Sequence, residues 1–389
     1  MVIFIFLICK EIYIMINKSN KIHTPALIID NNCLVKNIKT MSRYAKNNNI
    51  SIRPHAKSHK ISKIAKMQLK YGAIGICVAT LYEAEVMIKN NIKGVLLTTP
   101  ITNEHDKDRV KKLIRTSKSF MMIIDNPISI NYLNKVYKKN TYKANILIDC
   151  DIMGIGTNKI SRTGVRTIKE IITIARLVND STHLNYKGIT AYAGDIQHIN
   201  NYNKRKSETS IRHNYLKQII DNLKKENLSP KIISGGGTGS HDIDTKSKLY
   251  TELQPGSYIY SDVEYDNVSL YKSKSNPFKA GLFVAASIIS IIDKNNYIID
   301  AGLKALSTDS NFLPIPSGKL PSGSIYSFMG DEHGKITIPK NSKKILSLGD
   351  KVFIQPSHCD PTVNLYNNCK IITNNKIIDT WKIDARGYI

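Results

Sequence analysis

Short apolar runs alternate with longer amphipathic segments from residue 26 to about residue 235. The runs are rich in Ile, Val and Leu, as buried strands are, whereas the segments between them repeat apolar residues every three or four positions, as helices do. This pattern predicts eight strands, at residues 26–30, 51–57, 74–79, 94–99, 119–125, 144–151, 188–192 and 231–235. It also predicts helices at 34–47, 60–71, 81–90, 106–115, 167–177 and 211–226. Strands that alternate with helices pair in parallel, and eight such units indicate a closed (β/α)8 TIM-type barrel over residues 26–265.

The pattern changes after residue 265, where Gly and Pro turns separate short strands and no long amphipathic helix occurs. Strands are predicted there at residues 281–292, 297–300, 335–338 and 351–355. Residues 266–389 are therefore expected to form a separate, mainly antiparallel β domain, which is an ordinary domain size. The predicted fold class is α/β, with the barrel first and the β domain after it.

The chain begins with an apolar run at residues 2–9 (VIFIFLIC), which Lys10 ends. Eight residues are too few to span a bilayer, and the run has neither a basic residue before it nor a small-residue cleavage site after it. Residues 1–25 are expected either to reflect a start assigned upstream of Met15 or to join the β domain as a buried strand. No other segment approaches membrane length, and six cysteines without regular spacing suit free thiols, so we expect a cytoplasmic protein with no membrane partner.

The net charge is +25, from 56 Lys and Arg against 31 Asp and Glu. Such a surplus attracts anions over long range, so a nucleic-acid partner is one interpretation. The lysines are spread along the whole chain, however, often beside Asn and Ile, and neither an aromatic–basic ribonucleoprotein motif nor a zinc finger is present. A genome biased toward Lys, Asn and Ile codons explains the charge more simply, and we expect no nucleic-acid partner.

A basic cluster lies in the second predicted strand, where residues 51–60 read SIRPHAKSHK. Strand alternation places Arg53, His55 and Lys57 on one face, which cannot pack on an apolar helix layer and is expected to face the barrel mouth. Neighbouring cations lower the pKa of a lysine amine, and such an amine is a candidate Schiff-base nucleophile. A solvated sheet edge is the alternative for this segment taken alone.

Two glycine-containing turns end the barrel segment, IISGGGTG at residues 232–239 and QPGSY at 254–258. Glycines let backbone N–H groups approach an anion, and phosphate sites of barrel folds lie near the last strands. Each turn alone decides little, because turns use glycine for other reasons as well. A lysine at strand two combined with two such loops suggests pyridoxal phosphate (PLP), which needs a Schiff-base lysine and an anchored phosphate.

A candidate metal pair lies in the β domain, where residues 355–365 read QPSHCDPTVNL. In an extended chain His358 and Asp360 leave the same face, and their imidazole nitrogen and carboxylate oxygen could hold a divalent cation together. Two ligands leave room for water or substrate, as a catalytic metal requires. The alternative is a capping histidine followed by a turn aspartate before Pro361.

A candidate base follows the seventh predicted strand, in the segment AYAGDIQH at residues 191–198. Tyr192 ends that strand, and Gln197 and His198 come next in the loop. A neutral imidazole at a barrel mouth could act as a general base near pH 7. A histidine in a loop can also be merely exposed to solvent.

Taken together, these segments resemble the D-threonine aldolase and D-serine dehydratase family, PLP enzymes of the alanine-racemase (type III) fold. The resemblance covers nearly the whole chain. Its motifs are TPALIID at 24–30, RPHAKSHK at 53–60, RTGV at 162–165, AYAGDIQH at 191–198, SGGGTG at 234–239, TELQPGSY at 251–258, DAGLKALSTD at 300–309, GDEHG at 330–334 and HCDPTVN at 358–364. Nine motifs in this order are highly specific.

The resemblance implies a role for each motif. It implies that Lys57 holds PLP as a Schiff base, that His198 lies over the substrate, and that Arg162 faces the cofactor ring. It implies a divalent metal, Mn²⁺, Mg²⁺ or Zn²⁺, on His358 and Asp360. The remaining residues that it implies around PLP, with the phosphate held by the glycine loops, are His55, Tyr192, Gly236, Gly237, Thr238, Gly239, Gly256, Ser257 and Tyr258.

The resemblance also indicates an activity. In this family the metal pair of the aldolases has the form His-x-Asp, and that of the dehydratases has the form His-x-Cys. This chain has Asp360 and therefore resembles the aldolases. We therefore expect a homodimeric carbon–carbon lyase that cleaves D-3-hydroxy amino acids of the D-threonine type to glycine and an aldehyde. A 3-hydroxy-D-aspartate aldolase has the same machinery and stays an alternative.

Two other readings fit less well. A D-serine dehydratase is disfavoured by Asp360, and non-catalytic PLP carriers of the same barrel lack the β domain and the metal pair. Two segments depart from the family pattern: residues 151–162 are longer than the usual strand-six turn, and the first fourteen residues exceed the usual start.

Overall fold

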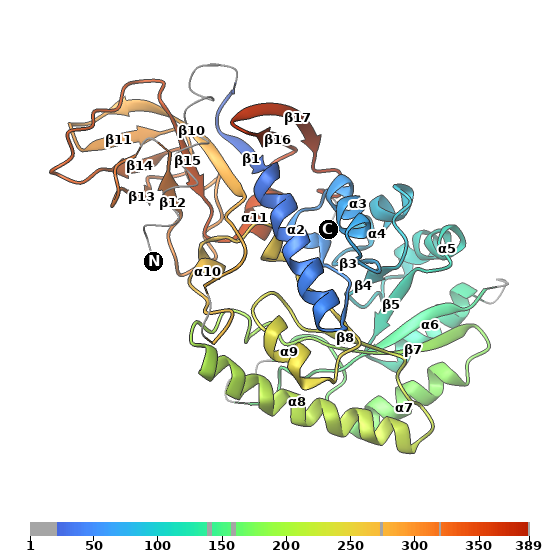
Figure 1. Ribbon diagram of the computed structural model, residues 1–389. Coiled ribbons are helices and arrows are strands. Elements are labelled where there is room, and N and C mark those ends of the chain that lie inside the picture. The colour runs from blue at the N-terminus through green and yellow to red at the C-terminus, as the bar shows by residue number, and fades with distance from the viewer. Residues whose placement is uncertain (1–21, 138–141, 157–160, 273–274, 319, 388–389) are drawn as a thin grey trace.

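The computed structural model of the chain describes residues 22–137, 142–156, 161–272, 275–318 and 320–387. A helix-covered barrel and a β-rich domain lie side by side in it (Figure 1). The predicted apolar run at residues 2–9 and Met15 lie outside the described residues, and the long turn at 151–162 is described only in part.

Eight parallel strands form the barrel, in the order β2, β9, β8, β7, β6, β5, β4 and β3. Their bounds are β2 (Ser51–Ile52), β3 (Ile76–Val78), β4 (Val95–Leu97), β5 (Met121–Ile124), β6 (Ala144–Asp149), β7 (Leu184–Ala191), β8 (Ile232–Gly235) and β9 (Glu252–Leu253). The sheet closes where His55 bridges Cys77 and the Cys77 N–H donates to the carbonyl of Pro54 at 2.8 Å. The prediction of a (β/α)8 barrel is confirmed.

Helices connect and cover the barrel strands (Figure 1). They are α2 (Asn31–Asn47), α3 (Ser62–Lys70), α4 (Leu81–Lys89), α5 (Lys107–Thr116), α6 (Pro127–Tyr137), α7 (Ile168–Asn179), α8 (Tyr202–Lys225), α9 (His241–Ser247) and α10 (Val263–Asp266), with short 3₁₀ turns η1 (Ala56–Ser58), η2 (Glu104–Asp106) and η3 (Ser257–Ile259). Side chains fix several starts: Thr80 accepts the N–H of Glu83, and Thr167 accepts that of Glu170. Each bond satisfies a donor that the first turn of a helix leaves unpaired.

The second domain is built on a nine-stranded, mostly antiparallel sheet, and it ends in a short helix and a hairpin. Its elements are β1 (Ala26–Asp30), β10 (Leu282–Ile291), β11 (Asn296–Ile299), β12 (Ile315–Ser317), β13 (Ile325–Phe328), β14 (Gly334–Thr337), β15 (Lys351–Gln355), α11 (Cys359–Asn364), β16 (Asn368–Thr373) and β17 (Lys376–Lys382). The main path runs β13, β14, β11, β10, β1, β16, β17, and β15 pairs with β10 and β12. The predicted antiparallel β domain is confirmed.

The assignment of residues 26–30 to the barrel is wrong. Strand β1 lies in the second sheet, antiparallel to β10 and parallel to β16, so that Leu27 is opposite both Val284 and Cys369. The eighth barrel strand is β9, a two-residue strand too short to show any apolar period. A strand buried along nearly its whole length, such as β1, has the same sequence pattern in either kind of sheet.

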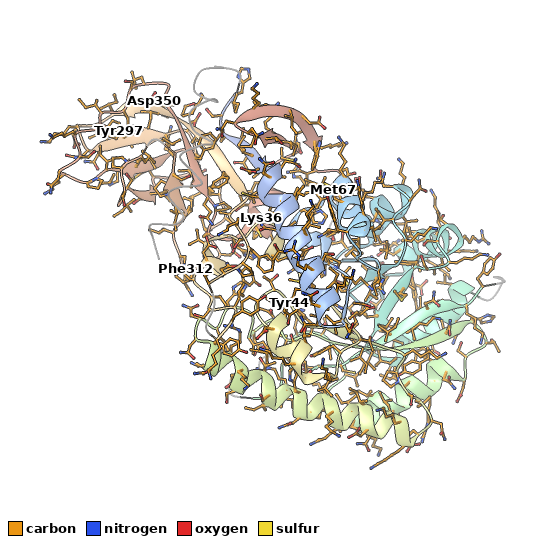
Figure 2. The ribbon with its side chains drawn as sticks, in the orientation of Figure 1. Lys36, Tyr44, Met67, Tyr297, Phe312 and Asp350 are labelled. Carbon is orange, nitrogen blue, oxygen red and sulfur yellow. The ribbon has the colours of Figure 1, made fainter. Side chains whose placement is uncertain are left out.

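Helix α2 joins the two domains (Figure 1). The side-chain amide of Asn37 donates to the carbonyls of Ile259 (2.9 Å) and Lys279 (2.7 Å), which ties the helix to the segment leading from the barrel into β10. At the far end of the helix Tyr44, labelled in Figure 2, packs edge-to-face on His241 with ring centroids 4.8 Å apart. One apolar core therefore runs from the barrel into the second domain, where it includes the fully buried Tyr297 (Figure 2).

A buried ion pair crosses the barrel interior. Arg53 Nε lies 2.7 Å from Glu252 Oε1 and Nη2 lies 2.9 Å from Oε2, and neither side chain is more than 5% exposed. We expect Glu252→Ala to lower the free energy of unfolding by about 3–5 kcal/mol, because the buried guanidinium would lose its charged partner and keep only the carbonyl of Gly94. Urea denaturation measures the loss. The double variant Arg53→Met with Glu252→Leu should recover most of it, and a single-variant loss below about 1 kcal/mol would contradict this role.

None of the described helices combines the length and the apolar composition that a membrane span needs. Cys77, Cys150, Cys359 and Cys369 are free and buried, as expected for thiols without disulfide partners.

Candidate active site

A cavity of about 540 Å³ lies at the carboxyl ends of the barrel strands and extends to the first turn of α11. Most of the predicted site residues line it, from both domains: His55, Lys57, Arg162, Tyr192, His198, Gly237, Thr238, Gly256, Ser257, His358 and Asp360. Active sites of (β/α)8 barrels occupy this end of the barrel. Residues far apart in the sequence are thus brought to one place.

Lys57 lies in η1, directly after β2, and its Nζ is 3.3 Å from Oδ2 of Asp360. That carboxylate raises the pKa of Lys57 above its usual value, although burial acts in the opposite direction. The expectation that crowded cations lower this pKa is therefore wrong. Arg53 turns into the barrel toward Glu252 instead of facing the cavity, and the strand itself ends at Ile52.

His55 forms a neutral part of the cavity wall. Its Nδ1 accepts the backbone N–H of Lys57 at 3.3 Å, and its Nε2 lies 3.0 Å from Oγ1 of Thr98. Burial, reinforced by the charge of Lys57, lowers the pKa of His55 to about 3. The imidazole is therefore uncharged at neutral pH, with its proton on Nε2, and it presents a flat surface to a ligand without adding positive charge.

Backbone N–H groups of the two glycine loops form a cradle for an anion. Within the described part of the chain, the N–H groups of Thr238, Gly256 and Ser257 have no acceptor, and all three residues line the cavity. A Cβ atom on Gly256 would lie 2.5 Å from Oγ of Ser58, so a larger residue here would force that hydroxyl to move. The unpaired N–H groups suit the phosphate of PLP, and the amine of Lys57 suits its aldehyde.

Three residues predicted to hold the phosphate lie behind this cradle rather than on the cavity surface. Gly239 donates its N–H to Oε1 of Gln197 at 2.9 Å, and Tyr258 donates its N–H to Oγ1 of Thr238 at 3.2 Å. Gly236 has φ of +68°, which favours glycine at that turn. Their positions support the loops from within, and Gln197 fastens the glycine loop to the segment that carries His198.

Arg162 and Tyr192 form another part of the wall, with the guanidinium carbon 5.8 Å from the centre of the phenol ring. Burial raises the pKa of Tyr192, so the phenol is neutral near pH 7. The predicted place of Arg162 beside the cavity is consistent with this geometry, and residues 157–160 before it lie outside the described residues.

His358 and Asp360 lie at the start of a helix, and not in the extended chain that the sequence predicted. His358 precedes α11 with an extended backbone, and Asp360 lies in the first turn. Nδ1 of His358 is 2.6 Å from Oδ2 of Asp309, which leaves Nε2 for a ligand in the cavity. Lys57 and His358 lower the pKa of Asp360 against the effect of burial, so the carboxylate is ionised.

These two side chains suit a cation that completes its coordination with substrate and water. Neutral imidazole nitrogen and carboxylate oxygen are ligands of Mn²⁺, Mg²⁺ or Zn²⁺. No group of three or more metal-binding side chains occurs among the described residues, so the protein offers two ligands here. Cys359 lies between them in sequence but is buried, and its thiol donates toward Asp360 at 3.2 Å.

His198 lies beside His358. Its ring centroid is 6.2 Å from that of His358 and 4.8 Å from that of Tyr265, and both contacts are edge-to-face. Nδ1 of His198 lies 2.8 Å from Oε2 of Glu264. An imidazole that faces the cavity with one nitrogen beside a carboxylate could act as a base.

A family model described as alanine racemase, N-terminal domain, matches residues 29–263, which is more than half of the chain. The chain belongs to this family. A second model, described as a putative serine dehydratase domain, matches residues 281–372. The predicted relationship to alanine-racemase-fold proteins is confirmed.

Individual relatives match both domains. The chain is 32% identical to the 3-hydroxy-D-aspartate aldolase of Paracoccus denitrificans (strain Pd 1222) over 372 residues, or 95% of this chain and 93% of the relative. It is 28% identical to the D-threonine aldolase of Arthrobacter sp. over 370 residues, or 95% and 94%. The crystal structure of D-threonine aldolase from Filomicrobium marinum superposes with a TM-score of 0.87 at 30% identity, covering 95% of this chain and 96% of that one.

In this alanine racemase-family chain, several cavity residues were not predicted from the sequence. Asp149 at the end of β6 accepts the hydroxyls of Thr190 (2.7 Å) and Thr163 (2.9 Å), and burial raises its pKa. Its place at the end of a predicted strand could have identified it. Glu264 and Asp309 could not have been identified in this way, because each acquires a role only through the histidine that the fold brings beside it.

Proposed function

We propose that this chain is a PLP- and divalent-metal-dependent aldolase that cleaves D-3-hydroxy amino acids of the D-threonine type to glycine and an aldehyde. The observation that carries the proposal is the convergence on one cavity of Lys57, His198 and the pair His358 and Asp360. The aldolase relatives that align with nearly the whole chain support it.

Each group in the cavity suits one requirement of this reaction. Lys57 would hold PLP covalently, and the N–H groups of Thr238, Gly256 and Ser257 would hold its phosphate. PLP would supply an electron sink at the substrate Cα, and a divalent cation held by His358 and Asp360 would lower the pKa of the substrate β-hydroxyl. His55 and Tyr192 are neutral side chains of the same wall, so neither would add charge beside the cofactor.

The proton is moved by His198. Its free ring nitrogen, Nε2, accepts the proton of the β-hydroxyl, so the O–H bond breaks and an N–H bond forms. The electron pair left on oxygen becomes the second bond of the aldehyde carbonyl, while the Cα–Cβ pair passes to Cα. Return of a proton to Cα completes glycine, and no oxidant or reductant is consumed.

The substrate side chain separates two members of this class. Two 3-hydroxy-D-aspartate aldolases of Paracoccus denitrificans, 32% and 31% identical to the chain, make that activity the alternative. A D-serine dehydratase is less well supported, because the metal pair contains Asp360 and not a cysteine.

An assay of glycine release decides between these activities. We expect the PLP-loaded protein to release glycine from D-threonine or D-phenylserine with Mn²⁺ or Mg²⁺, and far less without metal, with L-threonine as the stereochemical control. A strong preference for 3-hydroxy-D-aspartate would favour the alternative. Pyruvate from D-serine without glycine from the other substrates would identify a dehydratase, and no product from any of them would contradict the proposal.

The proposal includes a homodimer in the cytoplasm with no nucleic-acid partner. The homodimer follows from the fold resemblance, in which the β domain of one subunit faces the barrel mouth of the other. A monomeric mass in light scattering at micromolar concentration, with full activity, would contradict the dimer.

A further inference from the structure

The short helix α10 packs against His198 and is fixed to the segment before His358. The N–H of Val263 donates to the carbonyl of Pro356 (3.2 Å), and the N–H of Glu264 donates to that of Ser357 (3.1 Å). The Asp262 carboxylate accepts the N–H of Cys359 at 2.8 Å. Three hydrogen bonds therefore set the position of α10 relative to the metal pair.

The same helix contacts the ring of His198 through two side chains. Oε2 of Glu264 lies 2.8 Å from Nδ1 of His198, and the Tyr265 ring packs edge-to-face on the imidazole. Burial raises the pKa of Glu264, but the neighbouring His198 and Ser310 lower it overall, so the side chain is a carboxylate at neutral pH. Among the described residues, Nε2 of His198 has no partner, and the ring lines the cavity.

A buried arginine holds the loop of His198 against the segment that follows α10. Arg205 is fully buried, and its guanidinium donates to the carbonyls of Ile199 and Ser269 and, at 3.5 Å, to that of Asn200. The N–H of Ser269 returns a bond to the carbonyl of Asn200 at 3.0 Å. His198 and Glu264 thus lie on two segments that cannot separate without exposing unpaired buried groups.

We propose that Glu264 is a positioning residue that keeps the proton of His198 on Nδ1, so that Nε2 stays unprotonated and directed toward the substrate hydroxyl. Oε2 of Glu264 is buried, has no hydrogen bond among the described residues and lies 2.8 Å from Nδ1, so a small turn of the ring lets it accept the Nδ1–H and hold both the tautomer and the ring plane. When Nε2 takes the hydroxyl proton, the imidazolium that forms is stabilised by the negative charge of Glu264. This inference rests on the proposed function only in assigning the proton to a substrate hydroxyl.

Nuclear magnetic resonance of the ¹⁵N-histidine-labelled holoenzyme, without substrate, tests the placement directly. Long-range ¹H–¹⁵N spectra distinguish a protonated ring nitrogen from an unprotonated one, and the signals of His198 are those that disappear in His198→Gln. At a pH where the ring is neutral, we expect the proton on Nδ1. A proton on Nε2 in the wild-type protein would overturn the proposal, whether or not the enzyme releases glycine.

Two substitutions test the consequence for catalysis. Glu264→Leu should move the proton toward Nε2 and lower kcat about 10- to 100-fold, with KM changed less than about threefold, because ring orientation and not substrate binding is lost. Glu264→Gln keeps a hydrogen-bond acceptor of the same shape and should lower kcat less. The matched control Glu226→Gln, which removes an exposed partner of Arg176 on the outside of the barrel, should change neither quantity.

The outcomes separate this proposal from the proposed function. Wild-type kcat and an unchanged tautomer in folded Glu264→Leu would overturn the positioning role. If that variant does not fold, the wild-type tautomer and the Glu264→Gln kinetics still decide. Absence of glycine release from every substrate, with the Nδ1 tautomer observed, would contradict the function and leave the placement of Glu264 standing.

Discussion

Lys57→Ala is expected to abolish both the visible absorbance of bound PLP and the release of glycine. Lys57 is the only lysine among the described residues that line the cavity, and it stands beside the unpaired N–H groups of Thr238, Gly256 and Ser257. Without an amine at this position the aldehyde of PLP has no nucleophile to bind, so the protonated Schiff base that absorbs visible light cannot form. We expect activity to fall by at least about 1,000-fold, because covalent catalysis is lost altogether.

The matched control is Lys66→Ala, which removes an exposed lysine of α3 and should change neither the spectrum nor the rate. Titration with PLP, followed by borohydride reduction and mass spectrometry, identifies the modified lysine. A reducible imine that persists in Lys57→Ala would assign the Schiff base to another residue and would contradict the role given to Lys57.

Asp360→Ala is expected to behave like the wild-type enzyme treated with EDTA: cleavage is lost and the PLP spectrum is kept. The carboxylate is one of two side chains available to the cation, whereas the phosphate cradle and Lys57 make separate contacts with PLP. Loss of one of two ligands should lower the affinity for Mn²⁺ at least about 10-fold. Removing Asp360 also removes the negative charge that raises the pKa of Lys57, so this pKa should fall.

Glycine release, metal affinity by calorimetry and the visible spectrum measure the three parts of this prediction. Asp221→Ala, which removes an exposed carboxylate of α8 paired with Lys217, is the control. Asp360→Cys is the sharper variant: it should raise the preference for Zn²⁺ and reduce cleavage, with at most traces of pyruvate from D-serine, because His198 and Glu264 are unchanged. Cleavage of D-threonine at the wild-type rate by both the chelated protein and Asp360→Ala would show that these residues are structural.

The sequence pattern predicted the architecture better than it predicted the membership of individual strands. Seven of the eight expected barrel strands lie in the barrel, because each combines an apolar run with a following helix. Strand β1 was placed in the wrong sheet, since its partners Val284 and Cys369 are far away in the sequence and leave no local mark. Strand β9 was not predicted, because a strand of two residues is too short to show an alternation of apolar and polar positions.

The candidate site shows the same limit. The motifs around Lys57, the glycine loops and His358 were visible because several unusual residues stand together in the sequence. The side chains that surround these residues in the folded protein could not be predicted from the sequence. The pairing of Lys57 with Asp360 reverses the expected direction of the lysine pKa, and the partners of His198 and His358 depend on charges that only the folded chain brings together.

The position of β1 has a consequence for the order in which the protein can assemble during its synthesis. The barrel strands occupy residues 51–253, so they can pair while the rest of the chain is still being translated. Strand β1 leaves the ribosome before the barrel strands, yet it pairs with β10 and with β16, which both follow the barrel in the sequence. It must therefore wait until the chain beyond the barrel has been made, and α2 with its Tyr44 and Asn37 contacts is anchored at one end to a sheet that does not yet exist. Until β10 and β16 have been synthesised, both edges of β1 stay open to other chains, which makes this strand a place where a nascent molecule is exposed to mispairing.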